Sequence, residues 1–156
     1  MSITRFSALA GSAVVAAVAL SACEGTPLVT GKPPRTIEMS AAVTPAKEVP
    51  PKSGNGQAFA YLFYNEGTRG LTWKVYYTGL SGPATAAHIH GPADRDGNAG
   101  VVMPLAQGAP SSPMTGSATL TEAQAADLLA GKWYVNIHTQ ANPSGELRGQ
   151  IGDDNW

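Results

Sequence analysis

Two of the three histidines in the chain lie two positions apart, in the segment 86–93. Residues i and i+2 of a β-strand point to the same side, so a strand here would present the imidazoles of His88 and His90 to one point. The third, His138, ends the apolar run 133–138 and falls on its polar phase. We therefore predict a metal site formed by His88, His90 and His138.

Three neutral imidazoles are good ligands for copper or zinc, and the intrinsic order of divalent affinities favours copper. Three protein ligands also leave a coordination position open. With zinc, such a site would lower the pKa of a bound water to roughly 7, whereas copper would cycle between oxidation states. Copper is the predicted metal and zinc the alternative. The competing interpretation is that the histidines only hydrogen-bond a neighbouring loop in place.

Other polar residues are predicted to point to the same side of their strands as these histidines. Tyr134 and Asn136 lie on the phase of His138 and either face solvent or hydrogen-bond a ligand nitrogen. Glu146 and Arg148 share a phase on the last predicted strand, either as a solvated pair or with Arg148 steering an anion to the metal. That steering role of Arg148 is the one catalytic assignment the sequence suggests. Met103 either adds a soft sulfur ligand or packs under its loop.

The connection 91–114 has little periodic pattern, and long loops in a compact domain are often functional. Near its start, Asp94, Asp96 and Asn98 alternate like the oxygen ligands of a calcium loop. The glutamate expected at the twelfth position of such a loop is missing. A polar turn is therefore the preferred interpretation of this cluster.

The first 22 residues combine a basic start with an apolar, alanine-rich run, which is typical of an export signal. The segment 20–23 resembles the processing box of bacterial lipoproteins, in which the cysteine is acylated. Cys23 is the only cysteine, so it cannot form an intramolecular disulfide. We expect a lipidated Cys23, a flexible tether over 23–35, and a protein anchored to a bacterial membrane that faces the periplasm or the cell exterior. The alternative is an ordinary signal peptide with an incidental cysteine.

The rest of the chain is predicted to form one domain, 36–152, with a short tail at 153–156. The net charge is −1 and no lysine or arginine cluster appears, so nucleic acid is not an expected partner. An envelope protein remains a candidate partner. The chain lacks a nucleophile elbow, a phosphate-binding glycine loop and paired carboxylates, which leaves hydrolytic classes without support.

Short alternating runs separated by glycine and proline predict an all-β protein. Segment 65–70 is typical of a hairpin connection, and Thr121 with Gln124 forms a capping pattern for one short crossover helix that ends before Gly131. We expect Ala125, Leu128 and Leu129 to form its buried stripe. The seven predicted strands are 36–43, 57–64, 71–78, 85–90, 115–120, 132–139 and 145–151.

Three ordered motifs, 87–93, 134–139 and 142–151, together resemble the CHRD domain, named after chordin and found in many exported bacterial proteins. The resemblance covers roughly residues 36–152. It implies an immunoglobulin-like Greek-key β-sandwich, because the family is distantly similar to copper,zinc superoxide dismutases. The strand count predicted above agrees with that fold, while the biochemical function of the family is poorly defined.

The superoxide dismutase comparison implies particular ligands. His88 and His90 are similar to the His-x-His strand that binds copper there, and His138 is similar to a further copper ligand. Arg148 faintly resembles the arginine at the copper mouth, although its register differs. The loop 91–114 has no histidine for a zinc site, and Cys23 cannot make the disulfide.

Two functions remain open at this level. The first is a membrane-tethered copper protein that handles copper or removes superoxide, in which case any catalysis would depend on copper alone. The second is a non-enzymatic protein-interaction module whose histidines are structural. The residues do not decide whether the chain is an enzyme.

Overall fold

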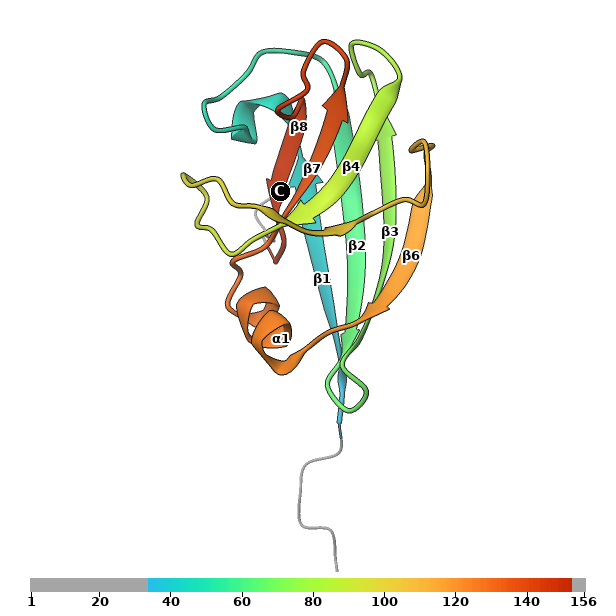
Figure 1. Cartoon of the computed structure of the whole chain (residues 1–156), viewed down its shortest axis with the longest axis vertical. Helices are drawn as coiled ribbons and strands as arrows, with labels where there is room; N and C mark the ends of the chain where they lie inside the picture. The colour runs from blue at the N-terminus through green and yellow to red at the C-terminus, as the bar shows by residue number, and fades with distance from the viewer. Residues whose placement is uncertain (1–33, 153–156) are drawn as a thin grey trace, which may run out of the picture. The chain divides into compact units, whose positions relative to one another are not determined.

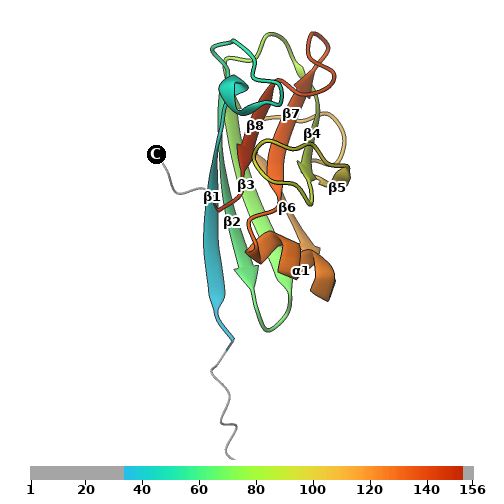
Figure 2. The same ribbon diagram turned by 90° about the vertical axis from the view of Figure 1, so that its left-hand side faces the viewer.

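Two antiparallel sheets of four strands each form a β-sandwich (Figure 1). The strand orders are β1-β2-β3-β6 and β5-β4-β7-β8, and Figure 2 shows the sheets as separate layers. The structure is a computed structural model that describes residues 34–152. The predicted all-β sandwich is confirmed, whereas the predicted export signal and Cys23 lie outside the described residues.

The elements follow the sequence pattern closely. In chain order they are β1 (Thr36–Val43), the 3₁₀ turn η1 (Pro45–Lys47), β2 (Gln57–Asn65), β3 (Gly70–Thr78), β4 (Ala84–His90), β5 (Val101–Pro104), β6 (Met114–Thr119), α1 (Glu122–Leu129), β7 (Tyr134–Thr139) and β8 (Leu147–Gln150). Within the described range, no helix is long and apolar enough to cross a membrane.

Alternation along the strands places one phase of each sheet in a shared core. On β2 and β3 the inward residues include Leu62, Leu71 and Val75, each fully buried. The second sheet contributes Ile89 and Ile137 from β4 and β7. Burial of this apolar surface is the main force that holds the layers together.

The structure has eight strands rather than about seven. β5 was missed because it is only four residues long and has no alternating pattern; it pairs with the end of β4. The helix α1 has the predicted capping box at Thr121 and Gln124. Its predicted buried stripe is wrong at Leu129, which is 48% exposed, because only Ala125 and Leu128 face the core.

The outer face of the second sheet is covered as well. All six residues of β7 are buried, including those on its polar phase. Hydrogen bonds hold the β4–β5 connection over this face, since Arg148 and Gln150 on β8 both donate to its carbonyl groups. The polar phase that carries the histidines is therefore enclosed by a loop.

Candidate metal centre

The three histidines meet on this covered face, on the neighbouring strands β4 and β7. Each offers one ligand nitrogen, and these atoms all lie within 4.8 Å of one another. In the antiparallel register, Ala86 is opposite His138 and His90 is opposite Tyr134. His88, two residues after Ala86 on β4, contacts the His138 ring, with ring centroids 5.1 Å apart. The three histidines predicted as ligands therefore lie close together, which the sequence alone did not decide.

Backbone carbonyl groups fix which nitrogens carry lone pairs. The Nδ1 atom of His90 lies 3.0 Å from the carbonyl oxygen of Ala99, and Nδ1 of His138 lies 3.1 Å from that of Pro143. A carbonyl oxygen only accepts, so both Nδ1 atoms carry protons and both Nε2 atoms carry lone pairs. Such bonds are the usual way in which a ligating histidine is oriented.

The lone pair of His90 has no partner. Its Nε2 atom is buried and forms no hydrogen bond. The Nε2 atom of His138 accepts a hydrogen bond from Nδ1 of His88 at 3.2 Å. An unpartnered buried acceptor costs about 1–3 kcal/mol, and a metal ion would satisfy it. The ligand set that fits is therefore Nδ1 of His88 with Nε2 of His90 and of His138.

The histidine nitrogens lie slightly farther apart than they would around a bound metal ion. Two nitrogens bound to the same metal at about 2.1 Å lie no more than about 4.2 Å apart. The observed limit of 4.8 Å closes to that value with side-chain shifts of about an ångström, within reach of small rotations. His88 is partly exposed, whereas His138 is 8% exposed, so the site is reached from the His88 side.

The surroundings of His88 and His138 favour the neutral form of their imidazoles. Burial lowers the pKa of His88, and the neighbouring His90 lowers it further. Burial also lowers the pKa of His138; the bond to the Pro143 carbonyl opposes this, while His88, His90 and Lys52 add to it. Neutral imidazole is the form that binds a metal.

A stack of three side chains borders the centre. The rings of His90 and Tyr134 lie parallel, with centroids 5.1 Å apart and planes inclined by 12°. The guanidinium carbon of Arg148 lies 3.7 Å from the centroid of the Tyr134 ring. Arg148 is 1% exposed, and the hydroxyl of Tyr134 bonds the backbone of Ala99. The expectation that Tyr134 faces solvent is therefore wrong.

Asn136 is buried too, and it bonds a residue that the sequence did not single out. Its amide donates to Oε1 of Glu48 at 2.7 Å and to the carbonyl oxygen of Leu147. Burial raises the pKa of Glu48, and the bond from Asn136 and the charge of Lys52 only partly oppose it. Glu48 directly follows η1 and precedes Asn136 by 88 residues. No rule of sequence spacing therefore links the two residues.

Glu146 does not form a solvated pair with Arg148. It is buried at the end of the β7–β8 connection and accepts bonds from Ser81, Thr139 and Asn142. Although burial raises the pKa of Glu146, these bonds outweigh it and hold the pKa below its ordinary value. The carboxylate thus anchors the loop that also carries the Pro143 carbonyl.

Met103 and the polar cluster of residues 94–98, the other candidate ligands considered from the sequence, do not join the centre. Met103 is opposite Ile89, and directly opposed residues in an antiparallel pair share a face. Ile89 is in the core, so Met103 packs there, on the side away from the histidines. Asp94 pairs with Lys132, and Asn98 accepts from Arg148, as expected for a polar turn. Within residues 34–152, the three histidines form the one group of His, Cys, Asp and Glu side chains with metal-site spacing.

The comparisons with known proteins agree with the motifs. The family model described as the CHRD domain matches residues 39–151, which is most of the chain and includes all three histidines. No curated protein matches the chain. No solved structure matches it either.

Proposed function

Since the chain belongs to the CHRD family, we propose that this member is a cell-envelope protein that binds copper through His88, His90 and His138. The observation that carries the proposal is the buried, unpartnered Nε2 atom of His90, within 4.8 Å of ligand nitrogens on two other histidines. An imidazole held with its lone pair turned toward two others has little purpose in a purely structural cluster.

The donor set supports copper ahead of zinc, because three imidazoles with an open position suit both ions and copper has the higher intrinsic affinity. A bound copper ion would supply one-electron redox chemistry. The chain's own contribution is to hold three imidazoles close together, to shield them under the β4–β5 loop and to leave access beside His88. Copper handling, or removal of superoxide, is the function that this arrangement favours.

Arg148 contributes to that function indirectly. Its predicted role was to steer an anion toward the metal, but a steering group must present its charge to solvent. Arg148 is 1% exposed and donates to three acceptors of the β4–β5 loop. We therefore expect the open side of the centre, rather than Arg148, to govern the approach of a small oxidant.

A lipid anchor at Cys23 would place the copper centre at a bacterial membrane surface, facing the periplasm or the cell exterior. This part of the proposal rests on the processing box at 20–23 and on the absence of a second cysteine. Radiolabelled palmitate incorporation in cells, compared with a Cys23→Ser variant, tests it. Equal labelling of both proteins would reject the anchor.

The copper site is tested on the chain from residue 23 onward carrying Cys23→Ser, which removes a competing thiol. The protein is loaded with Cu(II) or Zn(II), dialysed, and its bound metal is counted by native mass spectrometry. We expect one copper per chain in the parent and none in His88→Ala, His90→Ala or His138→Ala. Copper retention by all three variants, or by none of the proteins including the parent, would reject the site.

The second candidate is a non-enzymatic interaction module. Two observations favour it: the histidine bonds to Ala99 and Pro143 hold loops in place, and the outer face of the first sheet exposes Tyr61, Phe63 and Tyr76. This function predicts that the histidine variants lose stability while the parent retains no metal. The metal count therefore separates the two functions.

A further inference from the structure

We infer that Arg148 is a positioning residue of the metal centre: it fixes the β4–β5 loop and Tyr134, and through them it holds the ring of His90 with Nε2 turned toward the other histidines. The inference rests on the proposed metal-binding function for its consequence, but its structural part concerns the orientation of His90 alone. In this role Arg148 acts without contacting metal or substrate.

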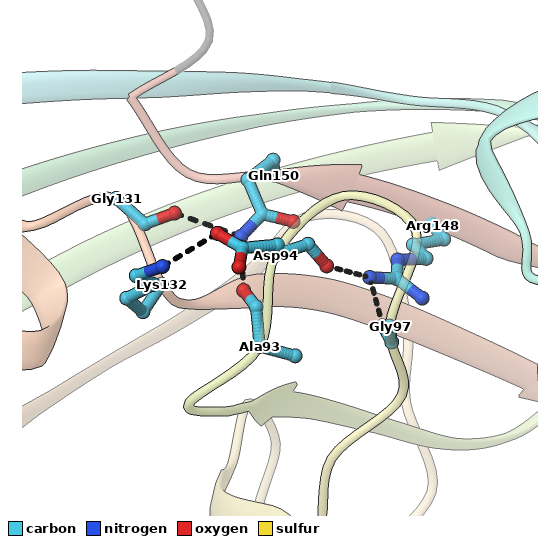
Figure 3. A network of polar contacts seen from close by, with 7 residues as sticks. All are labelled: Ala93, Asp94, Gly97, Gly131, Lys132, Arg148 and Gln150. Carbon is cyan, nitrogen blue, oxygen red and sulfur yellow. Dashed lines mark hydrogen bonds and ion pairs between the residues drawn. The ribbon is translucent and has the colours of Figure 1, made fainter.

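The first link joins Arg148 to the loop. Its guanidinium donates to the carbonyl oxygens of Asp94 at 3.1 Å and Gly97 at 2.7 Å, and to Oδ1 of Asn98 at 2.9 Å. Figure 3 shows the bonds from the Arg148 guanidinium to Asp94 and Gly97 of this loop. Three acceptors on one short segment match the rigid fork of donors that a guanidinium presents.

The second link joins the loop to the metal ligand. Ala99 directly follows Asn98, and its carbonyl oxygen accepts the Nδ1 proton of His90 at 3.0 Å. The backbone N–H of Ala99 donates to the hydroxyl of Tyr134 at 3.0 Å. The position of Ala99 therefore decides which nitrogen of His90 carries the proton and where Nε2 points.

The third link is the stack. The guanidinium carbon of Arg148 lies over the Tyr134 ring, and the His90 ring is stacked on Tyr134; Arg148 comes from β8 and His90 from β4, the two strands that flank β7. The cation and the loop bonds together fix both the plane of the His90 ring and its tautomer. Lysine would keep the charge but would lose the planar stack and the fork.

The start of the same loop is held by other residues, which supply controls. Gln150 donates to the carbonyl oxygens of Ala93 and Gly131, and Lys132 pairs with Asp94 at the surface (Figure 3). Gln150 is opposite Tyr134 in the β7–β8 ladder, but the side-chain hydrogen bonds of Gln150 and Lys132 go to neither Ala99 nor Tyr134. Loss of these contacts should loosen the loop at its beginning without turning His90.

The test compares Arg148→Met and Arg148→Lys with the control variants Lys132→Ala and Gln150→Met. In metal-free protein labelled with ¹⁵N at histidine, long-range ¹H–¹⁵N spectra report the tautomer of His90. We expect one tautomer with the proton on Nδ1 in the parent and in the controls, and a mixture of tautomers in both Arg148 variants. Copper affinity should fall by about 10- to 100-fold in the Arg148 variants, as is usual when the partner of a ligand is lost.

Arg148 is buried, so its variants are first checked for folding by circular dichroism and thermal melting. If they do not fold, Asn98→Ala decides the question, because Asn98 is exposed and its change removes one loop bond of Arg148. A His90 tautomer and copper affinity unchanged from the parent in the folded variants would overturn the inference. If the parent binds no metal but the tautomer shifts as expected, the positioning of His90 stands and the proposed function fails.

Discussion

The Nδ1 atom of His88 lies 3.2 Å from the Nε2 atom of His138, and the hydrogen bond between them uses the two nitrogens that a metal would need. Nδ1 of His138 is already protonated toward the Pro143 carbonyl, so the shared proton belongs to His88. A metal held by these two nitrogens would take the place of this bond, and His88 would then carry its proton on Nε2.

Because His88 and His138 would both bind the metal, we predict that copper raises the free energy of unfolding of the parent but not that of variants lacking either histidine. A ligand at 100 times its dissociation constant adds about 2.7 kcal/mol to the free energy of unfolding. Urea unfolding with and without Cu(II) should show this gain in the parent and lose it in His88→Ala and His138→Ala. A gain of the same size in both variants would place the copper elsewhere.

Without metal, the two variants should differ from one another. His138→Ala removes a buried side chain and leaves the Pro143 carbonyl without its donor, whereas His88 is partly exposed. We expect His138→Ala to lower the free energy of unfolding by about 1–3 kcal/mol and His88→Ala by less than about 1 kcal/mol. Equal losses, measured by urea unfolding, would contradict the asymmetry.

Glu146→Gln should destabilise the protein at neutral pH. The carboxylate accepts several hydrogen bonds, and an amide in its place can accept fewer and brings two donors of its own. Bonds to a charged group are worth about 1.5–3 kcal/mol, which is the loss we expect at pH 7.

The loss should depend on pH in a defined direction. The pKa of Glu146 is lowered in the folded state, so its stabilising effect is present above the unfolded pKa near 4.3 and disappears as the pH falls through the folded value. Urea unfolding from pH 7 to pH 3 should show the parent and Glu146→Gln converging on the acid side. Parallel curves throughout would show that the charge of Glu146 contributes nothing.

Alternating patterns predicted the sheets well because the side-chain period of a strand is fixed at two. The same rule placed His88 and His90 on one face. Their convergence with His138 depended on strand pairing, since a one-residue slip would have turned a ring to the other side. The sequence motifs singled out the three histidines, and the register of β4 against β7 brought them together.

Burial of the polar phase was not predictable from the same patterns. Tyr134, Asn136 and Arg148 alternate as solvent-facing residues should, yet the β4–β5 loop and the β1–β2 connection cover them. Periodicity reports which face a residue occupies, but a loop without periodicity gives no signal of where it packs. Glu48 was missed because it lies in such a loop and its partner Asn136 is distant in sequence.

The helix α1 offers a matched pair of leucines for testing the packing. Leu128 is 1% exposed and lies in the core, whereas Leu129 is 48% exposed. Leu128→Ala should cost about 2–5 kcal/mol of unfolding free energy, and Leu129→Ala should stay within about 0.5 kcal/mol of the parent. Urea unfolding of the two variants measures the difference directly; comparable losses would mean that both leucines are buried in solution.

Glu48→Gln should behave in the opposite way to Glu146→Gln. The pKa of Glu48 is raised, chiefly by burial, so the folded protein favours the protonated carboxyl. The stability gained from this raised pKa is complete below the unfolded pKa near 4.3 and is lost as the pH rises through the pKa of the folded state. A glutamine is neutral at every pH, and its carbonyl oxygen can still accept the bond from Asn136.

At pH 7 we expect the Glu48→Gln variant to have a free energy of unfolding at or above that of the parent, or at most about 0.5 kcal/mol below it. A loss at pH 7 as large as that of Glu146→Gln would show that the ionised Glu48, held by Lys52 and Arg148, stabilises the fold.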